Sequence, residues 1–198
     1  MKLSRLCCAL AVMLISHTAS SLKAEIQNVT VTWQAALCPD SCPDLLVREF
    51  NKISGVEKVD IQPGAGQLEL KWKPDVPFSF SPINTAMRMV GPRLKVIRVS
   101  VKGRIHSSGN NFAIVSDRDG TTFNLVNRIT PKPDQYFEQY NINTRTLPDE
   151  VIAELREKER NREVVVISGP LFQPERVLPL QLILEYMQKA EEPKKPGR

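Results

Sequence analysis

The sequence predicts an α+β protein of two domains, and two observations lead to that prediction. Between residues 25 and 101, the alternation of apolar and polar residues that is typical of strands is interrupted twice by helical spacing, in the order βαββαβ. From 102 to 190 the strand pattern dominates, with one helix before the last two strands. The first order is that of a ferredoxin-like domain, and the second is that of a small OB-like β-barrel.

The first strand and helix follow from residue spacing. In Ile26–Trp33 apolar residues alternate with polar ones, which predicts a half-buried strand. Pro43-Asp44 suits the first turn of a helix, and three apolar residues then follow on one helical face: Leu46, Phe50 and Ile53. Gly55 is expected to end this helix as its C-cap residue.

The rest of the first domain continues in the same way. Strands are predicted over 56–61 and 68–72, with a turn at 63–66, and a second helix over 81–90 is ended by Gly91. The next strand begins at Leu94 and keeps its alternation beyond Val101 to Ile105. This strand is therefore expected to continue into the second domain.

In the second domain, strands are predicted over 111–116, 121–126, 163–168 and 178–187. The Asp-Gly pair in 117–120 favours a hairpin turn, and Thr146–Asp149 is expected to cap a helix that ends near Arg160. Residues 128–145 have no clear period, so we expect a long, partly packed loop there. The charged tail, 191–198, is expected to be disordered.

Residues 1–24 have the pattern of a secretory signal. Lys2 and Arg5 precede an apolar run over Leu6–Ile15, and small and polar residues follow. We expect cleavage after Ala24, with Ala19 and Ser21 as alternative sites, and an exported protein, either periplasmic or secreted. No later apolar run approaches the roughly 18 residues of a membrane helix, so no membrane span is expected in the mature chain.

The charge of the mature chain argues against nucleic acid as a partner. Beyond residue 24 the chain has 24 Lys and Arg against 22 Asp and Glu, a formal charge of only +2. A nucleic-acid-binding surface needs a stronger basic patch. Phe112 and Phe123 could stack on bases, but their alternating positions in strands favour packing inside the barrel.

Cys38 and Cys42 are the two cysteines that remain after removal of the leader, and they stand directly before the first helix. Paired thiolates bind soft metal ions, and paired thiols also form disulfides. The start of a helix lowers the pKa of a thiol, because the helix dipole favours the anion. This pair is therefore the strongest candidate for a functional site.

From Cys38 to Val59 the sequence resembles the heavy-metal-associated domain, the ferredoxin-like module of copper chaperones and metal-transporting ATPases. That family has the pattern Met-x-Cys-x-x-Cys, then a helix, then Gly-Val-x-x-Val. Cys42 lies 13 residues before Gly55, which is the family's spacing, and Gly-Val-Glu-Lys-Val follows at 55–59. The resemblance covers about residues 26–101. It implies that Cys38 and Cys42 bind Cu(I), with a metal-donating or metal-accepting protein as partner.

The cysteine motif departs from the family pattern. Cys38 stands one residue early, which makes the motif CxxxC, and Ala36 replaces the family's Met. Two thiolates on such a loop can still hold Cu(I), a soft ion that suits sulfur. Zn(II) is less suitable, because a closed zinc site has four ligands.

Two other roles remain open for the same cysteines. Export favours a structural Cys38–Cys42 disulfide within a non-enzymatic interaction module. Cysteines at the start of a helix are also suited to thiol–disulfide exchange. Elsewhere no base, nucleophile or cofactor motif stands out, and His106 is expected to be a surface imidazole. No enzymatic activity is therefore expected.

Overall fold

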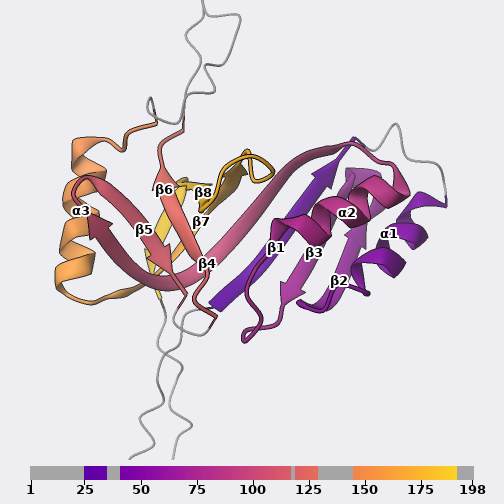
Figure 1. Cartoon of the computed structure of the whole chain (residues 1–198), viewed down its shortest axis with the longest axis horizontal. Helices are drawn as coiled ribbons and strands as arrows, with labels where there is room; N and C mark the ends of the chain where they lie inside the picture. Colours follow the sequence, from indigo (N-terminus) through magenta and orange to yellow (C-terminus); the bar gives the residue numbers. More distant parts are fainter. Residues whose placement is uncertain (1–24, 35–40, 117–118, 129–144, 191–198) are drawn as a thin grey trace, which may run out of the picture.

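The computed structural model describes residues 25–34, 41–116, 119–128 and 145–190. Within these ranges lie three α-helices and nine strands, which hydrogen-bond in the order β2-β3-β1-β4-β5-β6-β8-β7-β9. Figure 1 shows two halves side by side, a sheet with two helices and a barrel with one helix, joined by the long strand β4. None of the helices in the described ranges is long and apolar enough to cross a membrane.

The first half is an antiparallel sheet covered on one face by two helices (Figure 1). Its elements, in chain order, are β1 (Glu25–Trp33), α1 (Cys42–Phe50), β2 (Val56–Gln62), β3 (Gln67–Trp72), α2 (Phe80–Val90) and β4 (Leu94–Ser108). This order of strands and helices is the one that the residue spacing predicts. A 3₁₀ turn at Pro63–Ala65 joins β2 to β3, and Gly91 ends α2 with a φ of 104°.

The core of the first half lies between the sheet and the helices. The strands contribute alternate side chains, and the helices contribute one apolar face each; the most buried are Val29, Val31, Leu68, Leu70, Ile97, Leu46, Phe50, Ile83 and Met87. Burial of one such side chain stabilises the fold by about 1.5–3 kcal/mol. Met87 is therefore a core residue on the inner face of α2.

Strand β4 belongs to both halves of the molecule. Its 15 residues pair with β1 over 94–102 and with β5 (Asn111–Val115) over 104–108. Its opposite edge pairs with β7 (Val164–Phe172) over 98–104. The expected continuation of this strand beyond Val101 is confirmed. The predicted domain boundary, between 101 and 102, falls inside one continuous strand.

The second half is a five-stranded mixed barrel. Its strands follow each other around the barrel in the order β4, β5, β6 (Thr122–Val126), β8 (Leu180–Ile183) and β7, which pairs again with β4. The β6–β8 pair is parallel and the other pairs are antiparallel. A further strand, β9 (Tyr186–Lys189), extends the pairing of β7.

The barrel is filled by side chains, and α3 (Asp149–Arg160) packs against it. Phe112 and Phe123 are 1% and 0% exposed, so both pack inside the barrel as their alternation predicts. Leu155 of α3 is fully buried. These residues form one contiguous cluster with the core of the first half. The two halves therefore share a hydrophobic core.

Three aromatic rings connect the two halves. The ring of Phe78, in the segment before α2, lies 5.0 Å from Trp72 on β3 and 5.9 Å from Phe123 on β6, measured between centroids. The main-chain N–H of Phe78 also donates a hydrogen bond to the hydroxyl of Thr121, at 3.0 Å. Aromatic pairs at such distances stabilise beyond the area they bury.

The structure corrects the expected role of Gly55. Helix α1 ends at Phe50, with Asn51 as its C-cap residue, and Gly55 lies in the turns that follow. A Cβ at position 55 would lie 2.2 Å from Cζ2 of Trp72. Glycine is therefore required here because the indole ring packs against the backbone.

Two predictions for the second half need correction as well. The strand predicted over 178–187 is divided into β8 and β9 at 184–185. Gly169 of β7 passes this break so closely that a Cβ would lie 1.8 Å from the carbonyl oxygen of Ile183. Helix α3 begins at Asp149 after Pro148, and no side-chain hydrogen bond caps it. Most of the predicted loop, 129–144, and the tail, 191–198, lie outside the described residues.

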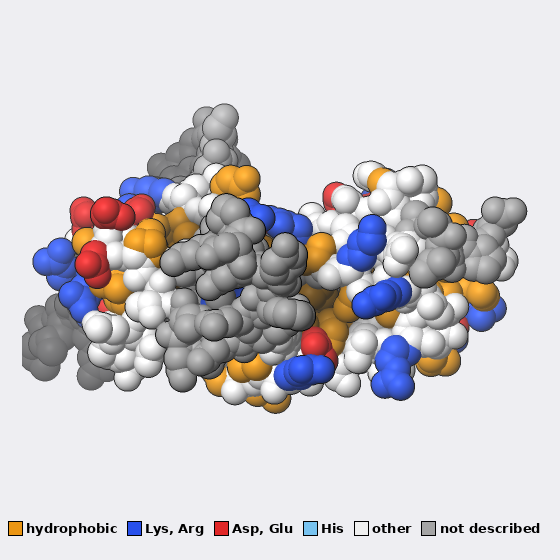
Figure 2. Space-filling view, turned by 90° about the horizontal axis from the view of Figure 1, so that it is seen from above, with side chains coloured by type: hydrophobic (Ala, Val, Ile, Leu, Met, Phe, Trp, Pro, Cys, Tyr) orange, Lys and Arg blue, Asp and Glu red, His pale blue; other side chains and the backbone are white. Residues whose placement is uncertain are grey.

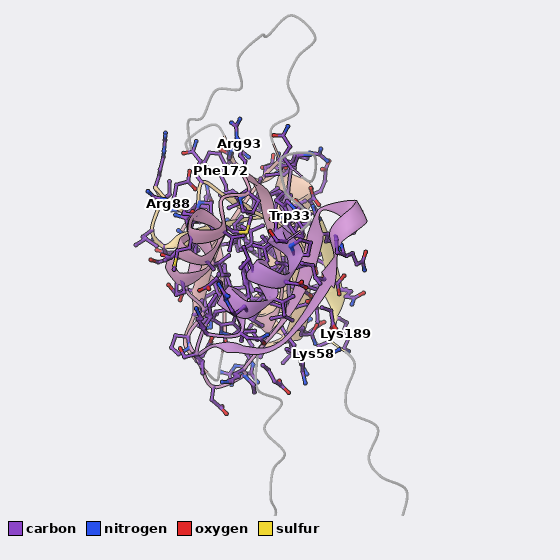
Figure 3. All side chains as sticks on the ribbon, turned by 90° about the vertical axis from the view of Figure 1, so that its right-hand side faces the viewer. Trp33, Lys58, Arg88, Arg93, Phe172 and Lys189 are labelled. Atoms are coloured by element: carbon purple, nitrogen blue, oxygen red, sulfur yellow. The ribbon has the colours of Figure 1, made fainter. Side chains whose placement is uncertain are left out.

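Charged side chains are distributed unevenly on the surface. Figure 2 shows acidic side chains gathered at the end of the molecule where α3 lies, and Lys and Arg side chains over the first half. Figure 3 shows Arg88 and Arg93, both exposed residues near the end of α2, projecting away from the fold. The acidic cluster at the α3 end thus has basic side chains beside it, and the face of the first half seen in Figure 2 carries mainly basic ones.

Candidate functional site

Of the two cysteines in the predicted site, Cys42 lies within the described residues and Cys38 does not. Cys42 is the first residue of α1, its side chain is 2% exposed, and it is disulfide-bonded. The other cysteines, Cys7, Cys8 and Cys38, lie outside the described residues. The structure therefore places Cys42 in a disulfide and shows what surrounds its side chain.

The surroundings of Cys42 are apolar. Its side chain belongs to the same buried cluster as Leu46 and Phe50, which line the inner face of α1. Pro43 occupies the first helical turn, and Asp44 places a carboxylate at the positive end of the helix dipole. Cys42 is therefore enclosed by the core, and an attacking thiolate in solution would have little access to its sulfur.

The oxidised state does not fit Cu(I). A Cu(I) site at this loop needs thiolate sulfur, and a disulfide sulfur carries no such charge. Among the described residues, no group of three or more His, Cys, Asp or Glu is placed to hold a metal ion. That result does not test a site made of two cysteines, one of which lies outside the described ranges.

Glu49 is the most buried carboxylate near the predicted site, on the second turn of α1. Its side chain is 8% exposed, and the ammonium group of Lys52 contacts both carboxylate oxygens at 2.8 Å. Arg48 donates a further hydrogen bond at 3.3 Å. The hydrogen bond from Lys52 is the main reason that the pKa of Glu49 lies below its usual value. Glu49 is thus held as an ion-paired carboxylate and is poorly suited to donate a proton.

The other residues considered in the sequence are separated from Cys42 in the fold. His106 is exposed and lies on β4, opposite Ala113 of β5, so it is a surface imidazole on a strand. Asp119 accepts hydrogen bonds from the main chain and hydroxyl of Thr121, which makes it a turn-forming residue. None of these side chains is brought together with the cysteine site.

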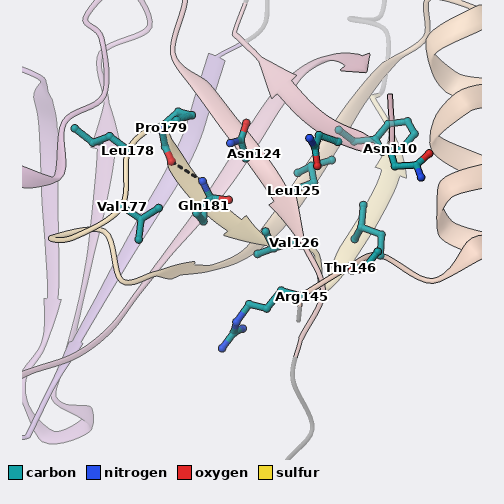
Figure 4. A pocket seen from close by; sticks show the side chains of 13 residues that line it. Asn110, Asn124, Leu125, Val126, Arg145, Thr146, Val177, Leu178, Pro179 and Gln181 are labelled. Atoms are coloured by element: carbon teal, nitrogen blue, oxygen red, sulfur yellow. Dashed lines mark hydrogen bonds between the residues drawn. The ribbon is translucent and has the colours of Figure 1, made fainter. Parts of the chain in front are cut away.

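A pocket of about 650 Å³ at the mouth of the barrel was not predicted. Figure 4 shows side chains from several segments around it, among them Asn124 on β6 and Gln181 on β8. Asn110, Arg145 and Leu178 line it as well. No motif connects these residues, which are spread over about 70 positions of the chain. The one sequence feature that several of the lining residues share is the carboxamide of Asn110, Asn111, Asn124 and Gln181.

Comparisons with protein-family models, with curated proteins and with solved structures find no match to this chain. The resemblance of residues 26–101 to the heavy-metal-associated domain therefore gains no support from them. The candidate site has to be interpreted from its own geometry and chemistry.

Proposed function

We propose that this protein is an exported, non-enzymatic interaction module, in which a Cys38–Cys42 disulfide braces the start of α1. The observation that carries the proposal is the state of Cys42, which is 2% exposed and disulfide-bonded. Cys38 is proposed as its partner because removal of residues 1–24 would leave no other cysteine. A disulfide is also consistent with export, since oxidising compartments maintain such bonds.

The role of the disulfide follows from where it lies. Helix α1 has only nine residues and no side-chain hydrogen bond caps its first residues. A crosslink at its first residue fixes the chain that enters the helix and lowers the entropy of the unfolded state. The buried sulfur argues for this structural role over thiol exchange, because exchange requires an exposed sulfur.

The arrangement of elements supports two fold assignments, which we include in the proposal. The first half has the order βαββαβ and the sheet order β2-β3-β1-β4, as in ferredoxin-like domains. The second half has five strands, a parallel β6–β8 pair and a helix after its third strand, as in OB-like barrels. Both folds serve many functions, so the assignments alone name none.

The test uses protein purified from its own compartment. We expect an intact mass that corresponds to a chain beginning at Glu25 and that is lower by two hydrogen atoms than the mass of the same chain with free thiols. Trypsin should release both cysteines within one peptide, 24–48 or 25–48, still lighter by two hydrogens. Free thiols in the native protein, or a bond that glutathione opens readily without denaturant, would contradict the structural role.

Cu(I) binding by the reduced pair is the second candidate, with a metal-donating or metal-accepting protein as partner. The observation in its favour is the position of Cys42 at the start of α1, where the helix dipole favours a negatively charged ligand. Reduced protein is titrated with Cu(I) against a competing chelator. One bound ion, lost in both Cys38→Ser and Cys42→Ser, supports this candidate, whereas failure to compete excludes it.

A further inference from the structure

The pocket at the mouth of the barrel has the size and position of a ligand site. Its volume of about 650 Å³ lies within the range of about 300–1,000 Å³ that is typical of ligand pockets, which often open at the mouths of barrels. Side chains from four segments reach it: the β5 start, β6, the residues before α3, and the β7–β8 loop with β8 (Figure 4).

Carboxamides supply most of the polar groups in this pocket. Gln181 is 5% exposed, and its amide nitrogen donates a hydrogen bond to the carbonyl oxygen of Pro179 at 2.7 Å (Figure 4). That bond fixes the side chain, and no described residue donates a hydrogen bond to its carboxamide oxygen. The side chains of Asn111 and Asn124 likewise make no hydrogen bond with the described residues. The pocket therefore offers a fixed acceptor and two groups that both donate and accept.

The side chains that the β7–β8 loop contributes to the pocket, Val177, Leu178 and Pro179, are apolar. Leu178 is 82% exposed, and it lines a second pocket as well. This second pocket has a volume of about 420 Å³ and lies between the β7–β8 loop and the start of α2. A chain-like ligand could thus pass from the barrel mouth over Leu178 into the second pocket.

The lining disfavours two ligand classes, cations and nucleic-acid bases. Among the described residues that line the barrel-mouth pocket there is no carboxylate, and Arg145 carries a guanidinium group that lies 3.8 Å from the ring centroid of Phe172. A cationic ligand is therefore disfavoured. Phe112 is the single aromatic residue in the described lining, and it is 1% exposed. Nucleic-acid bases depend on accessible aromatic rings for stacking, and none is offered here.

We infer that this pocket binds an extended peptide segment of a partner protein. A main-chain N–H of the peptide donates to the carboxamide oxygen of Gln181, and other main-chain amides pair with Asn111 and Asn124, which both donate and accept. An aliphatic side chain of the peptide covers Leu178 and removes it from water. This inference rests on the proposed interaction role and names the chemistry of the partner.

The test is an NMR titration of the ¹⁵N-labelled mature protein with its disulfide intact. The probe is a mixture of acetylated, amidated pentapeptides in which aliphatic and small polar residues alternate. Separate titrations use neutral trisaccharides and a single-stranded oligothymidylate. We expect the peptides alone to shift the side-chain NH₂ signals of Asn111, Asn124 and Gln181.

Variants distinguish this site from a nonspecific surface. Asn124→Ala should weaken peptide binding about fivefold, the loss expected for one hydrogen bond. Leu178→Ser should weaken it about tenfold, since an apolar contact is lost. Asn51→Ala, at the end of α1, is the matched control and should change neither affinity nor Tm. Unchanged melting of Asn124→Ala and Leu178→Ser separates lost binding from lost folding.

Three outcomes overturn the inference: no shift with peptides, a stronger shift with the trisaccharides or oligonucleotide, or equal weakening by Asn51→Ala. A protein that keeps an unreactive Cys42 disulfide but does not respond to peptides overturns this inference alone. A bond that exchanges readily in a protein that does bind the peptides overturns the structural role of the disulfide alone.

Discussion

The ring of Phe78 lies 5.9 Å from the ring of Phe123, and these two residues belong to different halves of the molecule. Phe78 is 6% exposed and also contacts Trp72 edge-on. We expect Phe78→Ala to lower the free energy of unfolding by about 3–5 kcal/mol, because it removes a buried ring and leaves a cavity. Urea denaturation followed by tryptophan fluorescence measures this, since Trp72 is part of the contact.

Phe78→Leu is the matched variant for that experiment. It keeps most of the apolar volume and should cost less than about 1.5 kcal/mol. If Phe78→Ala and Phe78→Leu both lower the free energy of unfolding only slightly and by the same amount, the ring contacts of Phe78 do not stabilise the packing of the two halves.

A second prediction concerns Gly55. Gly55→Ala places a methyl group within 2.2 Å of the Trp72 ring, and this ring is fixed by a hydrogen bond from its Nε1 to the carbonyl oxygen of Val76 at 2.8 Å. We expect a loss of about 1–3 kcal/mol, as for other overpacked positions. Gly64→Ala is the control, because nothing lies within 4 Å of its Cβ position. Chemical denaturation should show little change for Gly64→Ala; equal losses would point to a backbone effect.

A third prediction concerns the disulfide. The double variant Cys38→Ser/Cys42→Ser should have a free energy of unfolding lower by about 2 kcal/mol. This is the entropic contribution expected when a disulfide closes so small a loop in the unfolded chain. The wild-type protein should lose a similar amount when it is unfolded with reductant present. Loss of less than about 0.5 kcal/mol would mean that the bond contributes little, and the structural proposal would fail.

A fourth prediction concerns pH. The main-chain N–H and hydroxyl of Ser107 donate hydrogen bonds to Glu159 at 2.7 and 2.6 Å, and the hydroxyl bond is the main cause that lowers the pKa of Glu159. A lowered folded-state pKa stabilises the fold above the unfolded pKa of about 4.3, and this stabilisation is lost as pH falls through the folded value. Glu159→Gln should therefore be less stable than wild type at neutral pH, with a difference that shrinks below about pH 4.

Melting curves between pH 3 and pH 7 measure this difference. Glu150→Gln, an exposed carboxylate on the same helix, serves as the control and should parallel the wild type at each pH. A Glu159→Gln curve that stays parallel to the wild type would remove Glu159 as the source of the pH dependence.

The features that the sequence predicted correctly depend on residues that are close together in the chain. Alternation in 26–33 and 94–105 specified strands, since one strand face is buried. Gly91 marked the end of α2, where its φ of 104° is one that glycine adopts readily. Gly55 was misassigned because its constraint comes from Trp72, 17 positions away. The break between β8 and β9 was missed for the same reason, since it depends on the close passage of Gly169.

The candidate sites were predicted unevenly. The cysteine spacing identified Cys42 as a candidate site residue at the start of a helix. Spacing alone does not decide between a disulfide and free thiols. The barrel-mouth pocket left no motif, because Asn111, Asn124 and Gln181 come from separate strands that meet only when the barrel closes. Such a site becomes visible only when the strand order is known.

Strand β4 runs about 50 Å through both halves without interruption. A chain that ended at residue 101 would lose the part of β4 that pairs with β5, and it would expose an edge that β7 normally covers. Unpaired edges of this kind promote association with other chains. A cut at this point therefore leaves neither half with a complete sheet, because both halves depend on the same strand.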